Sequence, residues 1–473
     1  MELREVDVAV IGAGTAGLAA YRTAAAAGRR AVIIEGGPYG TTCARVGCMP
    51  SKLLIAAAEA AHATARWPEF GLRLEGGIKV DGRAVMARVK RERDRFVGFV
   101  LQGVDKIPAA DRIDGYARFI DDHTLQVDDH TRIRFSRAVI ATGSSPAVPA
   151  MFRGLGDRAI VNDAIFEWDD LPRSVAVFGP GVIGLELGQA LHRLGVQVIM
   201  FGKDHLVGPF TDPEVRAYAT RAFQNEFYLD ADADVHALDP VEGGVAVHYT
   251  DRAGTDRCDI VEYVIIATGR APNVRNLGLE HTSLALDTRG VPLFDRRTMQ
   301  CGASHIFIAG DANNDLPLLH EAADEGRIAG MNAADYPTVR TALRRTPLSI
   351  VFSDPQLAVV GRRHAELAPG SFVTGTVSFE DQGRSRVMLR HKGLLHVYAD
   401  ARNGLLLGAE MIGPDAEHLG HLLAWAIQAG CSVGQTLEMP FYHPVVEEGL
   451  RTALRDAQAR LQEGTAELQR RTA

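Results

Sequence analysis

Residues 6–17 read VDVAVIGAGTAG, and this stretch decides how the chain begins to fold. The β-rich run from Val6 to Ile11 predicts a buried strand, and the Ala-rich run from Leu18 to Ala27 predicts a helix. A second β-rich run, Ala31 to Ile34, follows the helix and ends at Glu35. Strand, helix and strand in this order form the unit from which parallel sheets covered by helices are built.

The glycines of this turn have separate mechanical tasks. Gly12 makes the tight turn, Gly14 lets the backbone approach a pyrophosphate, and Gly17 lets helix and strand pack closely. The N-terminus of the helix attracts phosphate charge, and Glu35 can bind a ribose hydroxyl. A glycine-rich turn by itself is also read as a plain tight connection. With a strand before it, a helix after it and the acid about 20 residues on, it predicts a dinucleotide site.

The same pattern recurs farther along the chain. A β-rich run from Val175 is followed by GPGVIG at residues 179–184, a helix through Leu194 and a strand that ends at Phe201. The chain is therefore expected to hold two dinucleotides. The second copy ends in Gly202-Lys203, which offers no carboxylate to a 2′-hydroxyl, whereas a cation there suits a 2′-phosphate.

The rest of the chain divides by pattern. Two further strand ends, Ile140-Ala141-Thr142-Gly143 and Ile266-Ala267-Thr268-Gly269-Arg270, resemble each other as if each closed one nucleotide domain, and a third apolar run ends in Gly310-Asp311. From about Thr346 strand-like runs and a helical run predict an α+β domain. These runs are 373–379, 394–399, 405–412 and 416–429. The charged tail from Leu450 to Ala473 is expected to be a packing or fraying helix.

Composition excludes several classes of function. The net charge of −8 comes from 51 basic and 59 acidic side chains without a long single-sign block, so we expect no nucleic-acid partner. No apolar stretch is long enough to cross a bilayer, and residues 1–7 have no basic n-region, so we expect no membrane partner and a cytoplasmic protein. Of five cysteines only Cys43 and Cys48 are close in sequence, and no second Cys or His pair matches them, so no metal site is expected.

The two close cysteines lie in GTTCARVGCMPSK, residues 40–52, before a helical run from Leu53 to Ala65. Four intervening residues let Cys43 and Cys48 form a small-ring disulfide. A helix N-terminus beside Cys48 would favour its thiolate. Two buried structural thiols are the alternative interpretation. The position of the pair, a few residues after Glu35, is where a flavin ring could lie.

With these motifs the chain resembles the pyridine-nucleotide-disulfide oxidoreductases, the group that contains dihydrolipoamide dehydrogenase, glutathione reductase and mercuric reductase. The resemblance covers nearly the whole chain. It rests on both glycine-rich units, the cysteine segment, both Ala-Thr-Gly strand ends, Gly310-Asp311 and His443-Pro444-Val445-Val446-Glu447-Glu448.

The resemblance implies a role for each redox residue. Cys48 would be the charge-transfer thiol against the flavin, and Cys43 would be the interchange thiol that exchanges with the substrate sulfur. His443 would be the general acid and base, delivered from the other subunit of a homodimer, with Glu448 orienting it. Histidine suits this task because it titrates near neutral pH, although a lone His is also read as a core or capping residue. Lys52 would lie near the flavin N5.

The resemblance also implies the cofactors, FAD and either NAD or NADP. Glu35 and Asp311 would bind the FAD ribose and ribitol, and Glu186 would pair with Lys52. The predicted cofactor-binding residues are Gly12, Gly14, Gly17, Glu35, Gly36, Thr42, Lys52, Thr142, Gly143, Gly179, Gly181, Val182, Ile183, Gly184, Glu186, Lys203, Gly269, Arg270, Gly310 and Asp311.

The expected fold is therefore α/β, with two Rossmann-like dinucleotide-binding domains, for FAD and NAD(P), and a C-terminal α+β dimerisation domain. We expect the first part of the FAD domain at 1–148, the NAD(P) domain at 149–272, the second, central part of the FAD domain at 273–345, and the interface domain at 346–473.

Some residues depart from the family pattern. Family members commonly have Gly-Gly before the Thr-Cys and Asn between the cysteines, where this chain has Gly40-Thr41 and Arg45. Many lipoamide dehydrogenases carry a second His before the His-Pro, where this chain has Phe441-Tyr442. These departures concern the surroundings of the flavin and the choice of substrate.

Four functions are weighed. The first is dihydrolipoyl dehydrogenase-like chemistry on a thiol/disulfide substrate, with a lipoyl-bearing carrier protein as a candidate partner. The second, motivated by Lys203, is an NADPH-driven reductase of glutathione-like or other low-molecular-weight disulfides. The third is a transhydrogenase or diaphorase, against which the intact cysteine pair argues. The fourth is a non-catalytic subunit of a larger complex, against which the retained site residues argue.

Overall fold

The computed structural model describes residues 1–472, with side chains through Gly464. The chain forms two compact units, and each is described by itself. Unit 1 comprises Met1–Pro50, Arg88–Ala147 and Gly269–Arg344, and unit 2 comprises Ser51–Ala87, Val148–Thr268 and Arg345–Ala473. Two long helices, α3 (Cys48–Ala63) and α4 (Gly82–Val104), each have residues in both units. The division into four domains remains our proposal.

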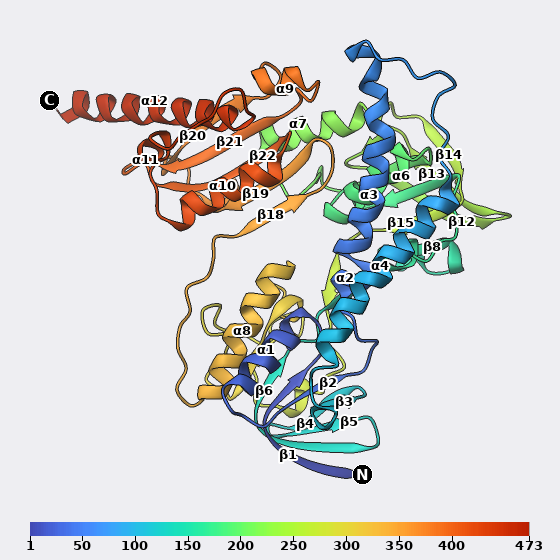
Figure 1. Ribbon diagram of the computed structural model, residues 1–473, viewed down its shortest axis with the longest axis vertical. Helices are drawn as coiled ribbons and strands as arrows, with labels where there is room; N and C mark the ends of the chain where they lie inside the picture. The colour runs from blue at the N-terminus through green and yellow to red at the C-terminus, as the bar shows by residue number, and fades with distance from the viewer. Residues whose placement is uncertain (473) are drawn as a thin grey trace. The chain divides into compact units, whose positions relative to one another are not determined.

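Unit 1 is built on a seven-stranded sheet whose strand order is β3-β2-β1-β6-β5-β4, with β17 paired to β6 (Figure 1). The strands β1, β2, β3, β6 and β17 pair in parallel, whereas β4, β5 and β6 form an antiparallel meander. The bounds are β1 Glu2–Ile11, β2 Ala31–Glu35, β3 Arg112–Asp114, β4 Ala117–Asp121, β5 Thr124–Val127, β6 Thr131–Ile140 and β17 Ile306–Ile308. A two-stranded ladder joins β7 (Ser144–Pro146) and β16 (Arg270–Pro272).

Strand β1 is central because its second half, from Val8 to Ile11, is apolar on both faces. Val8 and Val10 belong to one buried cluster and Ala9 and Ile11 to another. Side chains alternate across a strand, so a run without polar residues is stable only between two covered faces. The predicted first strand therefore becomes the middle of the sheet.

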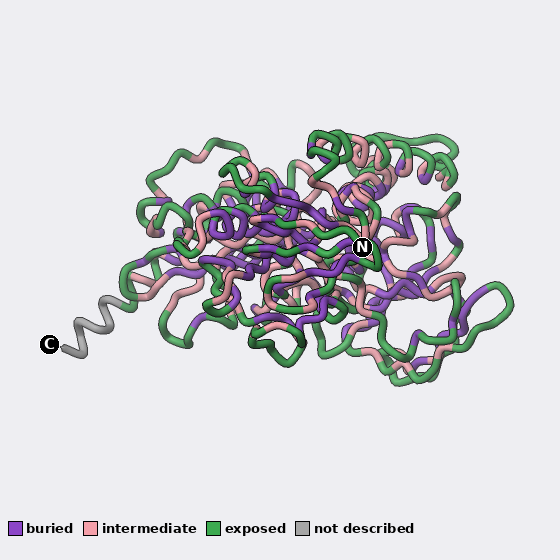
Figure 2. Tube along the Cα trace, turned by 90° about the horizontal axis from the view of Figure 1, so that it is seen from below, coloured by how far each residue is buried: buried purple, intermediate pink, exposed green. Residues whose placement is uncertain are grey.

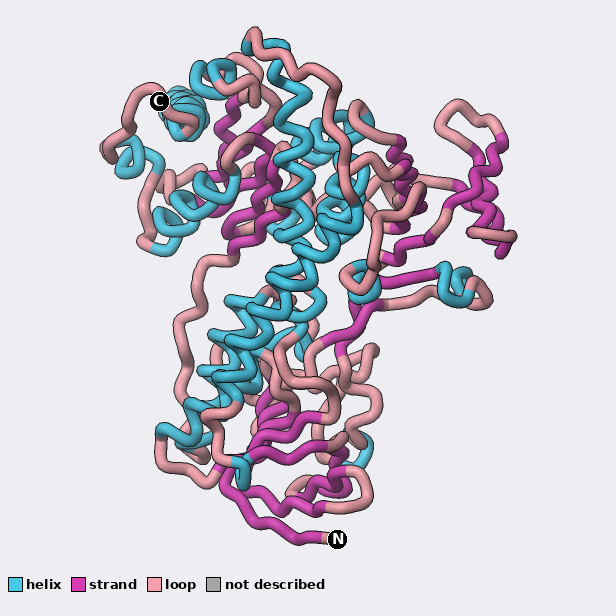
Figure 3. Tube along the Cα trace, turned by 45° about the vertical axis from the view of Figure 1, so that its right-hand side comes forward, coloured by secondary structure: helices cyan, strands magenta, loops and turns pink. Residues whose placement is uncertain are grey.

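Helices α1 (Thr15–Ala26) and α8 (Leu319–Asp335) pack side by side in unit 1 (Figures 1 and 3). Two glycines of α8 allow this close approach. A Cβ on Gly326 would lie 2.2 Å from the carbonyl oxygen of Ala16, and one on Gly330 would lie 2.5 Å from that of Ala20. The helix that begins at the first glycine-rich turn is thus fixed against the helix that follows Gly310-Asp311.

Unit 2 contains three sheets. A parallel five-stranded sheet has the order β11-β10-β9-β15-β8, a three-stranded antiparallel sheet has the order β12-β13-β14, and an antiparallel five-stranded sheet has the order β18-β19-β22-β21-β20. The first two have bounds β8 Ala159–Val161, β9 Ser174–Phe178, β10 Gln197–Phe201, β11 Tyr228–Asp230, β12 Asp234–Val241, β13 Gly244–Thr250, β14 Asp256–Val261 and β15 Tyr263–Ile266. The third has bounds β18 Leu348–Val351, β19 Gln356–Gly361, β20 Phe372–Ser378, β21 Leu394–Asp400 and β22 Leu406–Gly413.

Helices complete both units. They are α2 Thr42–Val46 in unit 1 and, in unit 2, α5 Asn162–Ile165, α6 Val182–Arg193, α7 Pro213–Gln224, α9 Gly383–Val387, α10 Ala416–Gln428, α11 Val433–Leu437 and α12 Glu447–Thr472. The predicted tail helix is α12, although Ala473 lies outside the described residues. Buried and exposed stretches alternate along the trace in Figure 2. The predicted fold class is confirmed: the chain is α/β, with Rossmann-like dinucleotide-binding folds and a C-terminal α+β dimerisation domain.

A buried polar network ties α7 to the last sheet within unit 2. Asp212 caps α7 and accepts hydrogen bonds from His396 Nδ1 and the Tyr398 hydroxyl, each at 2.8 Å. All three side chains are buried. Burial opposes ionisation of Asp212, but these two donors outweigh it and hold the pKa of Asp212 well below its usual range. Within residues 1–472 no helix is both long and apolar enough to span a membrane.

Candidate active site

The first glycine-rich turn is tight on two sides and open on the third. A Cβ on Gly12 (φ +104°) would lie 2.3 Å from the Ala141 carbonyl oxygen, and one on Gly17 would lie 1.8 Å from the Gly12 carbonyl oxygen. A Cβ on Gly14 would meet no atom of the described chain within 4 Å. The first and third glycines therefore close the turn, and the second leaves space for a ligand beside the backbone.

Glu35 ends β2 and holds this turn in place. Its carboxylate accepts hydrogen bonds from the backbone N–H of Ala13 at 2.7 Å and of Gly37 at 2.8 Å. The predicted neighbour Gly36 leaves no room for a side chain, since a Cβ there would lie 2.5 Å from the Tyr116 ring. The acid that the sequence assigned to ribose binding thus also organises the glycine-rich turn.

The segment that follows β6 contains a hydroxyl group without a hydrogen-bond partner in the described residues. Thr142 Oγ1 is buried without a hydrogen-bond partner in the described part of the chain. Its neighbour Gly143 has φ +69°, and Asn273 bonds to the backbone of both residues. A buried hydroxyl usually has a partner, so an orphan here fits a bound group. With the space at Gly14, it indicates that unit 1 would hold FAD, which supplies two-electron chemistry when bound.

Asp311 lies in the turn Gly310–Asn313 that joins β17 to α8. The Ser144 hydroxyl donates to its carboxylate at 2.7 Å, and Arg270 donates to the same Ser144 hydroxyl at 2.8 Å. The structure therefore brings the predicted residues Asp311 and Arg270 together through a serine that the sequence did not single out. Gly269 has φ +114°, which favours glycine.

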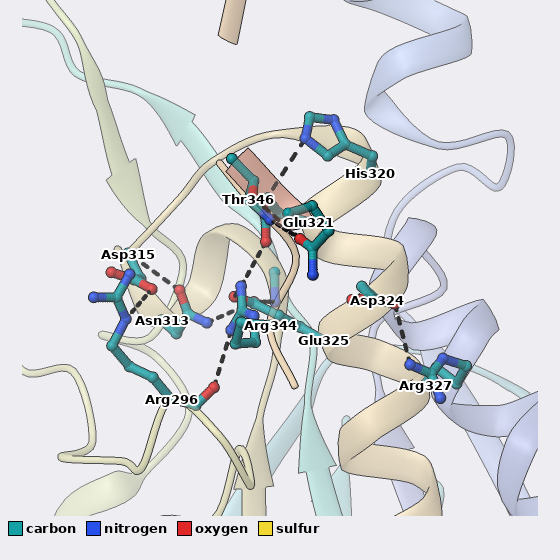
Figure 4. A network of polar contacts seen from close by, with 12 residues as sticks. Arg296, Asn313, Asp315, His320, Glu321, Asp324, Glu325, Arg327, Arg344 and Thr346 are labelled. Atoms are coloured by element: carbon teal, nitrogen blue, oxygen red, sulfur yellow. Dashed lines mark hydrogen bonds and ion pairs between the residues drawn. The ribbon is translucent and has the colours of Figure 1, made fainter. Parts of the chain in front are cut away.

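Sequence reasoning missed the residue that shapes the Asp311 turn. Glu325, on α8, is fully buried, and its Oε2 accepts hydrogen bonds from Gly310 N–H at 2.8 Å and from Asn313 Nδ2 at 2.7 Å. Arg344 donates to the other carboxylate oxygen at 2.8 Å, and Figure 4 shows these side chains turned toward one another. Glu321, Asp324 and Arg327 lie within four positions of Glu325, so no local pattern in the sequence singles it out.

The second glycine-rich turn, in unit 2, repeats the first. A Cβ on Gly179 would lie 2.4 Å from the Ala267 carbonyl oxygen, one on Gly184 would lie 1.9 Å from the Gly179 carbonyl oxygen, and one on Gly181 would meet no described atom within 4 Å. Val182 and Ile183 begin α6. The two turns share one geometry, so each would hold a dinucleotide in the same way.

Lys203 follows β10, where the second dinucleotide would place its adenine ribose. It is exposed, and it makes no ion pair with the side chains that the structure describes, which end at Gly464. Two residues on, His205 Nε2 lies 3.4 Å from Asp232 Oδ2, and both side chains are exposed. A free ammonium group at this position suits a phosphate better than a hydroxyl.

The cysteine pair spans a short helix that the sequence did not predict. Cys43 lies in α2 and is half-buried, whereas Cys48 is the first residue of α3 and is exposed. Between them a Cβ on Gly47 would lie 3.0 Å from the Thr42 carbonyl oxygen and 3.2 Å from Cys43 Cα. Gly47 therefore lets the turn before Cys48 fold back tightly on Cys43.

Thr41, where the family commonly has glycine, caps α2. Its φ of 60° with ψ of 148° lies in a region that favours glycine and that a β-branched residue rarely occupies. Its hydroxyl accepts a long hydrogen bond, 3.4 Å, from Ala44 N–H. The stem of Arg45 packs over Gly40, since a Cβ there would lie 2.9 Å from Arg45 Cδ. The two departures thus occupy neighbouring positions around α2.

Lys52 and Glu186 form an ion pair within unit 2. Lys52 Nζ lies 2.7 Å and 2.9 Å from the two oxygens of Glu186, which is 4% exposed. Phe352 N–H donates to the same carboxylate at 2.9 Å, and the Phe352 ring centroid lies 4.7 Å from Nζ. The buried carboxylate and the ring together fix the ammonium group, which is a third exposed.

His443 is presented outward by the segment before α12. Its Nδ1 lies 3.0 Å from Glu448 Oε2, while its side chain is 80% exposed. Arg451 donates to the second Glu448 oxygen at 2.7 Å. Burial opposes ionisation of Glu448, but Val445 N–H, His443 and Arg451 hold its pKa below the usual range. An oriented imidazole with an exposed Nε2 is suited to exchange protons with a group outside its own chain.

The predicted residues thus fall into local groups. The first turn, the cysteine pair and the Asp311 turn belong to unit 1, and the second turn, Lys52, Glu186 and the His443 pair belong to unit 2. Their catalytic roles stay predictions. No group of three or more His, Cys, Asp or Glu side chains in the described part of the chain is arranged to hold a metal ion.

Comparison with known proteins identifies relatives along the whole chain. The sequence profile described as pyridine nucleotide-disulphide oxidoreductase matches residues 6–326, and the dimerisation domain of the same name matches residues 348–454. Mercuric reductase of Shigella flexneri is 32% identical over 472 residues, which is 95% of this chain and 80% of that protein. Dihydrolipoyl dehydrogenase 3 of Pseudomonas aeruginosa is 30% identical over 479 residues, which is 97% of this chain and 99% of that protein.

Among solved structures, the HOCl-induced flavoprotein disulfide reductase RclA from Escherichia coli superposes with a TM-score of 0.80 at 23% identity, over 96% of this chain and 99% of that chain. This likeness shows the fold. The dimerisation domain supports a homodimer, and the family uses FAD and NAD(P). From both profile matches and relatives of this identity and coverage, the chain belongs to the pyridine nucleotide-disulphide oxidoreductase family of FAD-dependent disulfide oxidoreductases.

Proposed function

We propose that this protein is a dihydrolipoyl dehydrogenase-like enzyme that passes electrons between a dihydrolipoyl thiol pair and NAD(P) through its cysteines and FAD. The Cys43 segment carries the proposal, because Gly47 folds the chain tightly between two cysteines at redox-motif spacing. The oriented His443 supports it as the proton acceptor, supplied by the partner protomer of the homodimer. We also propose a cytoplasmic location, because a single close cysteine pair suits a reducing compartment.

The proposed exchange begins with a Cys43–Cys48 disulfide. His443 takes a proton from one substrate thiol, and the resulting thiolate attacks Cys43, so that a mixed disulfide forms and Cys48 leaves as a thiolate. The second substrate sulfur then attacks the first and releases Cys43, which takes up the proton that the second substrate thiol gives up. The substrate has become a disulfide, and both electrons reside on the cysteine pair. Lys52, fixed by Glu186, would provide positive charge where the reducing equivalents move on to the flavin.

One observation supports the division of roles between the cysteines. Cys48 starts α3, a helix of 16 residues, where the N-terminal dipole favours a thiolate. A charge-transfer thiolate must be stabilised in place, so this position suits the role that the family pattern gives to Cys48. The exposure of the two thiols does not support the division, since Cys43 is half-buried and Cys48 is exposed.

The test is steady-state turnover of the purified holoenzyme with dihydrolipoamide and each oxidised nucleotide. We expect reduction of NAD or NADP by dihydrolipoamide, its loss in Cys43→Ser and Cys48→Ser, and its retention in the control Cys258→Ser, which changes an exposed cysteine outside the motif. Turnover of dihydrolipoamide that survives in both motif variants would contradict the proposal. Addition of a lipoyl-bearing carrier protein in place of free dihydrolipoamide tests the candidate partner.

A second candidate is an NADPH-driven reductase of a low-molecular-weight disulfide, and the exposed ammonium group of Lys203 favours it. Because a charged hydrogen bond contributes about 1.5–3 kcal/mol, Lys203→Ala should raise the KM for NADPH about 10-fold to 100-fold and leave that for NADH unchanged. Lys106→Ala, another exposed lysine, is the control. NADPH oxidation with oxidised glutathione but none with lipoamide would favour this candidate over the first. Equal effects of Lys203→Ala on both nucleotides would remove its support.

A further inference from the structure

The segment that follows α8 runs back along that helix. Asn332 on α8 donates from Nδ2 to the Arg340 carbonyl oxygen at 3.0 Å and accepts from Arg340 N–H at 2.9 Å. Four residues on, Arg344 reaches the opposite end of α8 and donates to Glu321 at 2.6 Å and to Glu325 at 2.8 Å. This strap, residues 336–344, therefore delivers a guanidinium to two carboxylates one helical turn apart.

The two carboxylates are buried without enough counter-charge. The side chains of Glu321 and Glu325 are 3% and 0% exposed, and Arg344 is 17% exposed. Glu321 Oε1 has no hydrogen-bond partner in the described residues, although His320 Nε2 lies 3.9 Å from it. Arg344 is the group that pairs with both carboxylates. Burial raises the pKa of Glu325, and Arg344 works against that rise.

The ionised form of Glu325 is needed by the Asp311 turn. Its Oε2 accepts from two donors, Gly310 N–H and Asn313 Nδ2, whereas a protonated carboxyl is a weaker acceptor and brings a proton that needs its own partner. Asn313 in turn accepts from Asp315 N–H at 2.9 Å. One carboxylate oxygen thus holds two residues of the turn, and Figure 4 shows Asn313 beside Glu325.

We propose that Arg344 is a positioning residue for the flavin: through Glu325 it holds the Gly310–Asn313 turn in the shape that receives the ribityl chain beside Asp311. The residue touches neither flavin nor substrate. It acts at the end of the strap, where the chain leaves unit 1. The effect depends on the charge of Glu325, so it has a signature in pH that a packing role lacks.

The ionisable groups around Glu325 include a histidine on its own helix: His320 Nε2 lies 3.9 Å from Glu321 Oε1, and His320 is kept in every variant compared below. Arg344 and, through it, Glu321 reach the carboxylate, and a backbone carbonyl of Arg296 accepts from the second Arg344 nitrogen at 3.1 Å. The turn contributes Asp311, whose carboxylate is engaged by Ser144. Strand β17 has no ionisable residue, and the first ionisable residue of α1 is Tyr21, which donates to Asp111.

The experiment measures FAD affinity of the full-length protein by flavin fluorescence after release and rebinding, from about pH 8 to about pH 6. In Arg344→Met the dissociation constant for FAD should rise about 10-fold at the upper pH, as expected for a weakened buried hydrogen bond, and should rise further as the pH falls. Acidification protonates Glu325, whose pKa is no longer held down. Arg344→Lys should restore most of the affinity and remove the added pH dependence.

Two further variants separate charge from packing. Glu325→Gln should weaken FAD binding at every pH, and Glu325→Gln combined with Arg344→Met should bind FAD without the added pH dependence of Arg344→Met alone. The control is Arg327→Gln, on the same helix, which pairs with Asp324 at 3.2 Å and should leave FAD affinity unchanged.

A weakening in Arg344→Met that is equal at all pH values and is not relieved by lysine would overturn the proposal, as would wild-type affinity in that variant. If Arg344→Met does not fold, the double variant decides: a folded double variant with pH-independent FAD binding supports the role of charge, and one with the pH dependence predicted for Arg344→Met overturns it.

Discussion

Alanine at the second and third glycines of the first turn should have opposite consequences for the apoprotein. Gly14 has φ −74° and ψ −171°, which alanine adopts without strain, and its Cβ would meet no described atom within 4 Å. Gly14→Ala should therefore raise the free energy of unfolding of the apoprotein by about 0.4–1 kcal/mol, because it restricts the unfolded chain. Gly17→Ala would place a Cβ 1.8 Å from the Gly12 carbonyl oxygen, and overpacking of this kind costs about 3 kcal/mol or more.

FAD affinity should respond to Gly14→Ala in the opposite sense to the stability of the apoprotein. The space at Gly14 is where the pyrophosphate would approach the backbone, so a methyl group there should raise the dissociation constant for FAD about 10-fold to 100-fold, which corresponds to about 1.5–3 kcal/mol of lost charged hydrogen bonding. Urea unfolding of the apoprotein gives the first quantity and flavin fluorescence titration gives the second. A stabilised protein that binds its cofactor poorly is the expected result for Gly14→Ala.

The second turn supplies the matched control. Gly181→Ala is the counterpart of Gly14→Ala, and Gly184→Ala, with its Cβ 1.9 Å from the Gly179 carbonyl oxygen, is the counterpart of Gly17→Ala. Gly181→Ala should keep FAD and lose affinity for the nicotinamide nucleotide. Wild-type FAD affinity in Gly14→Ala would refute the assignment of that glycine, and wild-type stability in Gly17→Ala would refute the packing argument.

Three further outcomes are expected. His443→Gln should lower thiol turnover about 10²-fold to 10⁴-fold, the usual contribution of a general acid and base, and Glu448→Gln should lower it less, while stopped-flow reduction of the flavin by NADPH stays unchanged. Asp212→Asn should lower the free energy of unfolding at neutral pH by about 2–4 kcal/mol. The folded state lowers the pKa of Asp212, so the stabilisation from its carboxylate is present above the unfolded pKa of about 3.9 and is lost as the pH falls through the folded pKa. The free energy of unfolding of Asp212→Asn, measured in urea, should therefore depend less on pH in the acid range than that of the wild type. Thr41→Gly should raise the free energy of unfolding by about 1–2 kcal/mol, because the backbone strain at φ 60° costs more than the 3.4 Å hydrogen bond from Ala44 N–H to the Thr41 hydroxyl contributes. A lower free energy of unfolding would show that this hydrogen bond matters more than the strain.

The features that the sequence predicted are those whose cause is local. Gly12 and Gly17 are required by contacts with the turn itself and the strand end beside it, so their spacing is visible in the chain. Strands β20, β21 and β22 and helix α10 begin and end within one or two residues of their predicted bounds, because each has a regular apolar period. The sheet β12-β13-β14 was not predicted, since β14 is exposed along most of its length and has no apolar alternation.

The site residues that sequence reasoning missed contact partners that are distant in the sequence and close in the fold. Arg344 follows Glu325 by 19 positions, and nothing in either segment shows that the strap returns along α8. The pairing of Lys52 with Glu186, 134 positions apart, was expected only from the family pattern, and it joins a residue of α3 to a residue of α6. The helix between the cysteines was missed because a five-residue helix has no period to detect and depends on its cap.

The glycines within the two turns and the residues outside them contribute differently to how a duplicated turn can serve different cofactors. The glycines of both turns have the same clearances to within 0.1 Å, so the turns alone do not distinguish one dinucleotide from another. What differs lies outside them: in unit 1 the turn is held by Glu35 and faced by the orphan hydroxyl of Thr142, whereas in unit 2 the corresponding strand ends before Lys203. Because a carboxylate accepts a hydrogen bond from a ribose hydroxyl and an ammonium group attracts a phosphate, we expect selectivity to depend on Glu35, the last residue of β2, and on Lys203, two residues beyond β10. Exchange of Lys203 for glutamate should therefore change the nucleotide that the second turn prefers without changing the first.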